Sequence, residues 1–161
     1  MWLSVDQARV FAATGGRPFY PGRPCLVFVH GAGMDHTVWA QQARYFAHHG
    51  FTVLALDLPG HGRSEAPSLE SVTALAAWVC RVLEAAGAAS AALVGHSMGA
   101  LIALEAAAQA PDRITALALL ATSFPMAVHD GLLASAARNE HLALDMINNW
   151  AHSHGAQMGS N

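Results

Sequence analysis

Short apolar runs alternate with amphipathic segments along most of the chain. Four of the runs have the length and continuity of strands buried on both faces of a parallel sheet: Cys25–Val29, Thr52–Leu56, Ala91–Val94 and Ile114–Leu120. The segments between them carry apolar residues at helical spacing. This order, in which a helix follows each of the first three strands, predicts an α/β fold. We expect a mostly parallel sheet with right-handed crossovers and helices on both faces.

The predicted helices are bounded by residues that cap or break helices. Thr37 is expected to cap the first helix, and Gly50, a residue suited to a left-handed stop, is expected to end it. The second helix is predicted over about residues 68–86, and the third over residues 98–110. A short edge strand, Val10–Ala13, is expected before the first buried strand.

The pattern changes after Phe124-Pro125. Residues 126–154 are rich in alanine, leucine, histidine and asparagine and contain no β-branched run, so they predict two short helices. The expected organisation is an α/β region over residues 1–124, followed by a helical region over residues 125–161.

Composition narrows the range of functions. The chain has 161 residues, of which 53% are hydrophobic and 12% charged, with a formal net charge of −3. These values fit one soluble domain and provide no basic footprint for nucleic acid. The longest apolar stretch, Ile114–Phe124, is shorter than the roughly 18 to 20 residues that a membrane span needs. No secretory signal is recognised, so a cytoplasmic location is expected, with Cys25 and Cys80 as reduced thiols.

A G-x-S-x-G pattern, Gly95-His96-Ser97-Met98-Gly99, lies between a predicted strand and a predicted helix. In this context the pattern predicts a tight strand-to-helix turn that carries Ser97 as a nucleophile, with glycines where side chains would collide. The backbone N–H of Met98, at the helix N-terminus, would stabilise the oxyanion formed when Ser97 attacks a carbonyl. The alternative is a glycine-rich turn in which the serine is incidental.

A second glycine-rich loop, His30-Gly31-Ala32-Gly33, follows the first buried strand. In the fold that the G-x-S-x-G pattern predicts, the loop at this position contributes a second oxyanion donor, which here is the backbone N–H of Ala32. His30, Gly31, Gly33 and His96 are expected to line the substrate site. For His30 itself, support of the loop is a better interpretation than proton transfer.

Three motifs, in this order, resemble those of the α/β-hydrolase family: Val27-Phe-Val-His-Gly-Ala-Gly-Met-Asp-His-Thr-Val-Trp39, Asp57-Leu-Pro-Gly-His-Gly-Arg-Ser64 and Gly95-His-Ser-Met-Gly99. The likeness covers roughly residues 10–124. It is greatest to the branch of small esterases, lactonases, non-haem haloperoxidase-like proteins and C–C bond hydrolases. The resemblance implies an α/β-hydrolase fold, Ser97 as the nucleophile, and Ala32 and Met98 as oxyanion donors. It implies no metal and no organic cofactor.

The resemblance also separates branches of the family. In relatives the loop that corresponds to Asp57–Ser64 shapes the wall of the site, so no catalytic role is assigned to it. The haloalkane dehalogenase and epoxide hydrolase branches carry Asp at the elbow, and Ser97 therefore argues against both.

The acid and the base of a catalytic triad are not found in this chain. The family order is serine, then an acidic residue, then histidine. No strand-like segment follows Leu120, whereas the resemblance places the acid and the base after two further strands. We therefore expect an N-terminal part of a longer hydrolase that stops inside a helical cap and is inactive alone. The residues that could formally complete a triad are Glu105, Asp112, His129, Asp130, Glu140, His141, Asp145, His152 and His154.

The expected function is hydrolysis of a small carboxylic ester or lactone through an acyl-enzyme on Ser97. One alternative is C–C bond hydrolysis on the same fold. Another is a catalytically silent fragment that acts as a binding module. Four leucines could line an acyl pocket or simply bury a cap helix: Leu132, Leu133, Leu142 and Leu144.

Two further features bear on partners. His141, His152 and His154 invite a metal site, but no set of four ligands is complete, so solvated histidines and no metal are expected. The strand Ile114–Leu120 would present an unpaired edge, and we expect poor solubility or self-association through it.

Overall fold

The computed structural model describes residues 1–65 and 67–151, so His152 and His154 lie outside the described residues. The chain forms two compact units, Met1–Thr122 and Ser123–Asn161, which are called here the N-terminal and the C-terminal unit. No helix among the described residues is long and apolar enough to cross a membrane.

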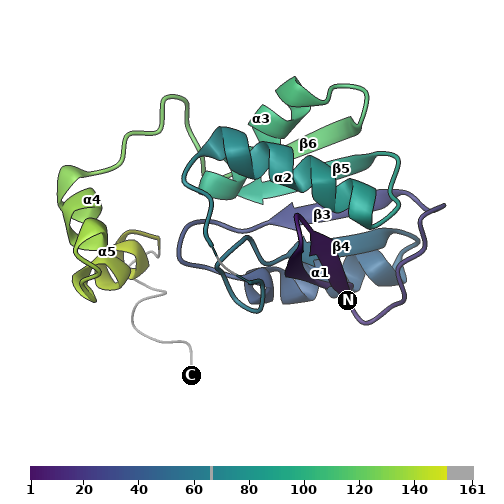
Figure 1. Cartoon of the computed structure of the whole chain (residues 1–161), viewed down its shortest axis with the longest axis horizontal. Helices are drawn as coiled ribbons and strands as arrows, with labels where there is room; N and C mark the ends of the chain where they lie inside the picture. Colours follow the sequence, from purple (N-terminus) through teal and green to yellow (C-terminus); the bar gives the residue numbers. More distant parts are fainter. Residues whose placement is uncertain (66, 152–161) are drawn as a thin grey trace. The chain divides into compact units, whose positions relative to one another are not determined.

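The N-terminal unit contains a six-stranded sheet with the order β1-β2-β4-β3-β5-β6. Figure 1 shows β4, β3, β5 and β6 in this order across the sheet. The pairs β3–β4, β3–β5 and β5–β6 are parallel, and the pairs β1–β2 and β2–β4 are antiparallel. A mostly parallel sheet with helices is therefore confirmed. The strands are β1 (Trp2–Val5), β2 (Ala8–Ala13), β3 (Cys25–Val29), β4 (Thr52–Leu56), β5 (Ala91–His96) and β6 (Ile114–Leu120).

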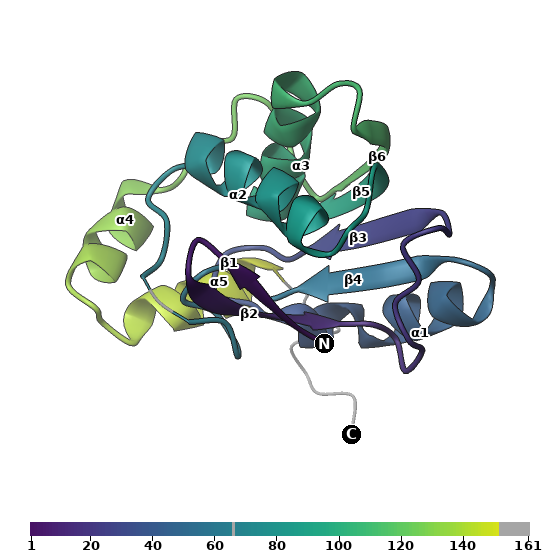
Figure 2. The same ribbon diagram turned by 45° about the vertical axis from the view of Figure 1, so that its right-hand side comes forward.

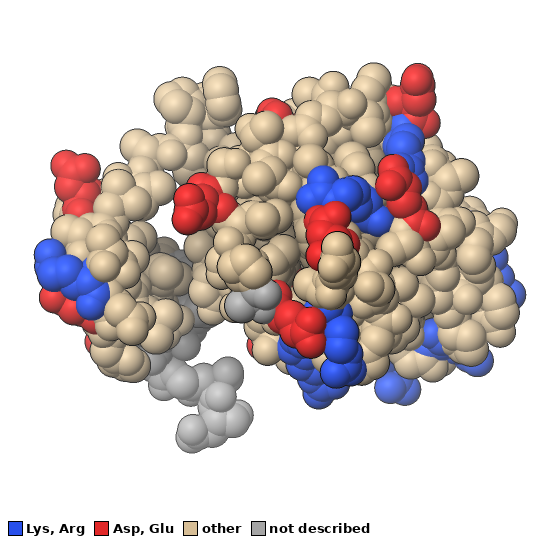
Figure 3. Space-filling view, in the orientation of Figure 1, with Lys and Arg blue, Asp and Glu red and all other residues tan. Residues whose placement is uncertain are grey.

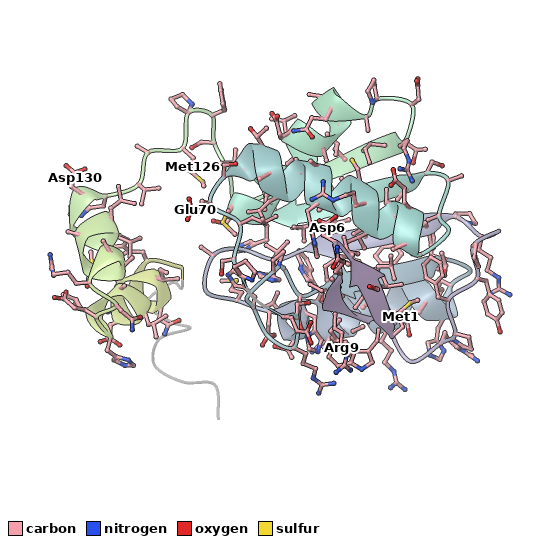
Figure 4. All side chains as sticks on the ribbon, viewed as in Figure 1. Met1, Asp6, Arg9, Glu70, Met126 and Asp130 are labelled. Carbon is pink, nitrogen blue, oxygen red and sulfur yellow. The ribbon has the colours of Figure 1, made fainter. Side chains whose placement is uncertain are left out.

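The N-terminal hairpin corrects the prediction of a single edge strand. β2 begins at Ala8 and lies inside the sheet, while β1 forms the edge. The turn between them consists of Asp6 and Gln7, with φ of 52° and 67°. Both residues occupy the left-handed region that two-residue hairpins need, although neither is glycine. In Figure 4 Asp6 and Arg9 mark this hairpin.

The three α-helices of the N-terminal unit agree with prediction in number and order, a 3₁₀ helix precedes the first of them, and the second begins at Val72 instead of near residue 68. They are the 3₁₀ helix η1 (His36–Trp39) and the α-helices α1 (Ala40–His48), α2 (Val72–Ala85) and α3 (Met98–Gln109). The prediction that Thr37 is a cap is wrong. Asp35 is the N-cap, because its carboxylate accepts a hydrogen bond from the Thr37 amide over 2.8 Å. Gly50 has a φ of 94°, as expected of a left-handed stop.

Apolar side chains cover both faces of the central strands. Figure 2 shows α2 and α3 on one side of the sheet and α1 on the other. In β3, Val27 and Val29 point into the cluster that contains α2 and α3, whereas Leu26 and Phe28 point into the cluster that contains η1 and α1. All five residues of β3 and all five of β4 are buried. This burial explains why both segments are continuous apolar runs.

β6 is an edge strand with a different environment. Among the described residues it pairs only with β5, and of its seven residues only Ile114 is buried. Leu117, Leu119 and Leu120 are 36%, 41% and 43% exposed. An apolar edge strand is a site for pairing with another strand.

The C-terminal unit contains two helices, α4 (Asp130–Ala137) and α5 (Leu142–Ala151), as the sequence predicts. His129 caps α4, since its Nδ1 accepts a hydrogen bond from the Gly131 amide over 3.0 Å. Leu133, Leu142 and Leu144 are 54%, 56% and 47% exposed within the unit, and Leu132 is half-buried.

Candidate active site

Ser97 lies on the turn between β5, which ends at His96, and α3, which begins at Met98. Its φ of 53° and ψ of −120° are unusual for a residue with a side chain. The turn is tied to the neighbouring strand because the Ser97 amide donates a hydrogen bond to the Leu120 carbonyl over 2.9 Å. Ser97 itself is half-buried. A strained residue with an accessible hydroxyl is the geometry of a nucleophile elbow.

The glycines of the motif are required by close packing. A Cβ added to Gly95 would collide with the Gly99 carbonyl oxygen, and one added to Gly99 would collide with the carbonyl oxygens of Val29 and His30. These contacts are with backbone atoms, which cannot move aside as a flexible side chain can. The first turn of α3 is therefore pressed against the end of β3.

The loop after β3 reaches the same place. A Cβ on Gly31 would lie 3.1 Å from His96 Nδ1 and 3.3 Å from Ser97 Cβ. Gly33, with a φ of 69°, and Ala32 are exposed, and His96 is half-buried. The structure thus brings together the two loops that the sequence analysis singled out.

The amides of Ala32 and Met98 are available as donors. Within residues 1–65 and 67–151, neither amide donates a hydrogen bond to a protein acceptor. For Met98 this follows from its position, because the first N–H groups of a helix have no intrahelical acceptor. Backbone amides without a protein acceptor can stabilise a developing negative charge.

His30 supports the loop. Its side chain is 0% exposed, its Nδ1–H donates to the Gly31 carbonyl over 2.8 Å, and its Nε2 accepts a hydrogen bond from the Leu58 amide over 3.1 Å. Burial lowers the pKa of this ring, which keeps it neutral. The enclosed ring and the use of both nitrogens agree with the interpretation of His30 as a support of the loop, and its place in the lining of the substrate site stays a prediction.

The far end of the same loop is fastened by Asp57. The Asp57 carboxylate is 0% exposed. Its Oδ1 accepts hydrogen bonds from the backbone N–H and the Nδ1–H of His36, each over 2.8 Å, and its Oδ2 accepts one from the Arg63 amide over 2.9 Å. A Cβ on Gly62 would collide with this carboxylate. Asp57 and Leu58 therefore hold residues 30–36 at both ends.

This clamp was not predicted from the sequence. The Asp57–Ser64 motif was interpreted as a wall of the site, and Asp57 was not paired with His36, which lies 21 residues earlier. The available signal was a carboxylate directly after a buried strand, because such a group needs hydrogen-bond donors once it is buried.

Comparison with known proteins shows the family of the chain. The family described as "alpha/beta hydrolase fold" matches residues 24–139. The chain belongs to the α/β-hydrolase family.

Individual relatives carry different names. The chain is 39% identical over 134 residues to the dihydrolipoyllysine-residue acetyltransferase component of the acetoin cleaving system of Cupriavidus necator, covering 81% of this chain and 34% of that protein. It is 35% identical over 100 residues to (E)-2-((N-methylformamido)methylene)succinate hydrolase of Acinetobacter baylyi, covering 62% of this chain and 37% of that protein. This α/β hydrolase thus spans about a third of the length of these curated relatives.

Solved structures share the fold. Epoxide hydrolase A from Mycobacterium thermoresistibile superposes with a TM-score of 0.66 at 30% sequence identity, covering 74% of this chain and 37% of that chain. The fold-class prediction and the resemblance to α/β hydrolases are both confirmed.

The N-terminal unit of this α/β hydrolase contains no histidine after Ser97. Glu105 lies in the middle of α3 and accepts a hydrogen bond from Gln109 Nε2 over 2.8 Å, and Asp112 lies in the turn after α3. The other described candidates for an acid or a base belong to the C-terminal unit: His129, Asp130, Glu140, His141 and Asp145.

In the C-terminal unit several of these groups already have partners. The Glu140 carboxylate accepts hydrogen bonds from Arg138 and Ser135, and these bonds lower the pKa of Glu140. His141 is 81% exposed, with its Nε2 3.6 Å from Asp145 Oδ1. These contacts all lie within the C-terminal unit.

One group of side chains has the composition of a metal site. Ligand atoms of Asp35, His36 and Asp57 lie within 4.8 Å of one another. However, Asp57 Oδ1 is used by His36, and Asp35 Oδ1 by the backbone and hydroxyl of Thr37. These hydrogen bonds account for the cluster as part of the loop clamp, so we assign no metal to it.

Proposed function

We propose that this α/β hydrolase is a serine hydrolase that cleaves a small carboxylic ester or lactone through an acyl-enzyme on Ser97. One observation carries the proposal. A half-buried serine occupies a strained elbow, beside two loops that each contribute an unpaired backbone amide.

The steps follow from this arrangement. The Ser97 oxygen forms a bond to the carbonyl carbon, and its proton passes to a base. The resulting oxyanion accepts hydrogen bonds from the amides of Ala32 and Met98, where removal of a single donor typically costs about 10² to 10³ in rate. The bond to the alcohol oxygen then breaks, and the alcohol takes the proton. Water attacks the acyl group in the second half of the reaction and releases the acid and Ser97.

The identity of the nucleophile favours acyl chemistry over epoxide opening. Attack of a serine hydroxyl on an epoxide would give an ether, which water cannot cleave under mild conditions. Attack on an ester or a lactone gives an acyl-serine, which water can cleave. We therefore assign acyl transfer to this chain even though a structural neighbour is an epoxide hydrolase.

The proposal requires a base that is oriented by an acid. We infer that both lie outside Met1–Thr122, since this unit contains no histidine after Ser97. Within the unit, His36 and Asp57 form the only hydrogen-bonded histidine–carboxylate pair of the described residues, and they are used in the loop clamp.

Labelling with a fluorophosphonate probe tests the proposal. We expect one adduct per chain, on Ser97, in any longer product of the gene that supplies both the base and the acid. The 161-residue chain is expected to label much more slowly. The readout is the mass of the labelled peptide.

Two substitutions act as controls. Ser97→Ala should abolish the adduct, whereas Ser90→Ala, at the other end of β5, should leave it unchanged. If neither product is labelled, the serine hydrolase proposal is wrong and a catalytically silent binding fragment is favoured. Labelling that survives Ser97→Ala would assign the nucleophile to another residue.

A further inference from the structure

The basic residues are distributed unevenly over the N-terminal unit. The chain contains eight arginines and no lysine. Among the described residues, Arg81, Arg113 and Arg138 form ion pairs with carboxylates, while the other five arginines do not. Between Asp6 and Asp57 the sequence contains a single acidic residue, Asp35. Figure 3 shows arginine side chains along the lower right margin with no acidic side chain beside them in that view.

Part of this charge surrounds a surface hollow of about 300 Å³. We call it the arginine hollow; it is lined by Arg17, Pro18, Tyr20, Arg23, Ala47, His48 and Gly50. The lining comes from the segment between β2 and β3 and from the end of α1. The hollow lies near the starts of β3 and β4, whereas Ser97 follows the end of β5, which runs in the same direction. It is therefore separate from the candidate active site.

The cationic groups of the hollow are held in place without carboxylates. Arg17 Nη2 lies 3.3 Å from His48 Nδ1. Because a guanidinium can only donate, Nδ1 is the acceptor and the proton of the neutral ring is on Nε2. The guanidinium of Arg23 lies 4.7 Å from the centre of the Tyr20 ring. This stacking holds the group and leaves its N–H donors free.

The hollow has excess positive charge. Asp35, the one acidic residue between Asp6 and Asp57, caps η1, and its carboxylate accepts hydrogen bonds from the amide and the hydroxyl of Thr37. Desolvation, followed by the charges of Arg17 and Arg44, lowers the pKa of His48. An anion in the hollow would relieve this repulsion.

The backbone that carries these groups is ordered by hydrogen bonds of its own. The Tyr20 amide donates to Thr52 Oγ1 over 3.0 Å, and the Arg23 amide donates to the Tyr20 carbonyl over 3.1 Å. The Thr52 amide donates to the Pro24 carbonyl over 2.9 Å. These bonds fix the turn 20–23 against the start of β4, so the hollow is formed before any ligand arrives.

We propose that the arginine hollow binds a phosphomonoester group, which Arg17 and Arg23 contact through their guanidinium N–H donors. Two guanidinium forks supply more donors than one carboxylate can accept, whereas a phosphate offers three oxygens with two negative charges. His48, which also lines the hollow, carries a further N–H donor at Nε2 when its Nδ1 accepts from Arg17. The inference does not depend on the proposed reaction at Ser97.

Calorimetric titration with glycerol 3-phosphate at constant ionic strength tests the proposal. We expect saturable binding at one site. Arg17→Gln and Arg23→Gln should each weaken it by about tenfold or more, because each removes charge-assisted hydrogen bonds. Arg81→Gln is the matched control, since this arginine is paired with Asp6 outside the hollow, and we expect less than about a twofold change.

A second arm distinguishes a soluble ligand from a lipid headgroup. Sedimentation with phosphatidylcholine vesicles, with and without phosphatidic acid, presents the same phosphomonoester on a membrane. If the protein sediments with vesicles only when phosphatidic acid, Arg17 and Arg23 are present, the ligand is a lipid headgroup. If it binds glycerol 3-phosphate but does not sediment with the vesicles, the ligand is a soluble phosphomonoester. Either result supports binding of a phosphomonoester in the arginine hollow. No saturable binding in either arm, or an equal loss with Arg81→Gln, would overturn it. Thermal unfolding of each variant verifies that the exposed substitutions leave the fold intact.

Discussion

β3 and β6 resemble each other in sequence and differ in environment. Both are uncharged apolar runs, Cys25–Val29 and Ile114–Leu120. β3 lies between two parallel neighbours and all its residues are buried, whereas β6 has one neighbour among the described residues and only its first residue is buried. An apolar run therefore shows that a strand suits a sheet interior, but its burial depends on what packs against it.

The same contrast applies to the candidate site. The loops after β3 and β5 belong to the buried centre of the sheet. They pack so closely at their glycines that no side chain would fit there, and hydrogen bonds of His30 and Asp57 hold the loop after β3. Nothing comparable is assembled beyond β6 within the N-terminal unit, where no histidine follows Ser97. The centre of the sheet thus carries the oxyanion half of the proposed site, and the acid–base half is assigned elsewhere.

The largest expected effect compares matched leucines in neighbouring strands. Leu93 in β5 is 0% exposed, and Leu119 in β6 is 41% exposed. We expect Leu93→Ala to lower the free energy of unfolding by about 3 to 5 kcal/mol, because it removes buried apolar surface and leaves a cavity. Leu119→Ala should cost less than about 1 kcal/mol.

Urea denaturation of the two variants measures this difference. Equal losses at both positions would contradict the comparison, because they would mean that β6 is buried to a similar degree in solution. A change in the slope of the denaturation curve for one variant alone would indicate altered compactness instead.

The next effect concerns the pH dependence of the buried centre. Burial lowers the pKa of His30 in the folded protein, so the unfolded chain takes up a proton at a higher pH than the folded one. The contribution of the neutral ring to the free energy of unfolding is complete above about pH 6.5, the pKa of histidine in the unfolded chain. It is lost as the pH falls below this value. The slope contributed by one such proton is at most about 1.4 kcal/mol per pH unit.

His30→Gln is expected to remove this part of the slope between about pH 6.5 and 5, while lowering stability at pH 8. His49→Gln, at an exposed histidine, is the control and should leave the slope unchanged. Denaturation midpoints measured across this range test both. A wild-type slope that persists in His30→Gln would assign the acid sensitivity to other groups.

How far the sequence predicts this molecule depends on the range of the interactions. The central strands were predictable because burial on both faces produces continuous apolar runs, and the elbow was predictable because steric crowding demands glycine at Gly95 and Gly99. The hairpin at Asp6 was missed because its left-handed turn contains no glycine.

Contacts between distant residues could not be predicted from local patterns. The bond between His36 and Asp57 spans 21 residues, and the contact between Arg17 and His48 spans 31. Neither pair has a spacing that marks it in the sequence, because the sheet order alone brings the loops together. The cap at Asp35 was missed for a local reason: Asp35 and Thr37, two positions apart, are both good caps, and the geometry of η1 selects the first.

The smallest effect on stability is expected at the edge itself. We propose that exposed β6 pairs weakly with β6 of a second copy, because its outer N–H and C=O groups have no partner strand among the described residues and its sequence contains no charge.

Leu119→Lys places a charge on the 41% exposed side chain and should change the free energy of unfolding by no more than about 0.5 kcal/mol. Sedimentation velocity at increasing concentration should show self-association of the wild-type chain and its loss in this variant. Leu104→Lys, at a 42% exposed leucine on α3, is the matched control and should still associate. If both variants associate like the wild type, the contact lies on another surface.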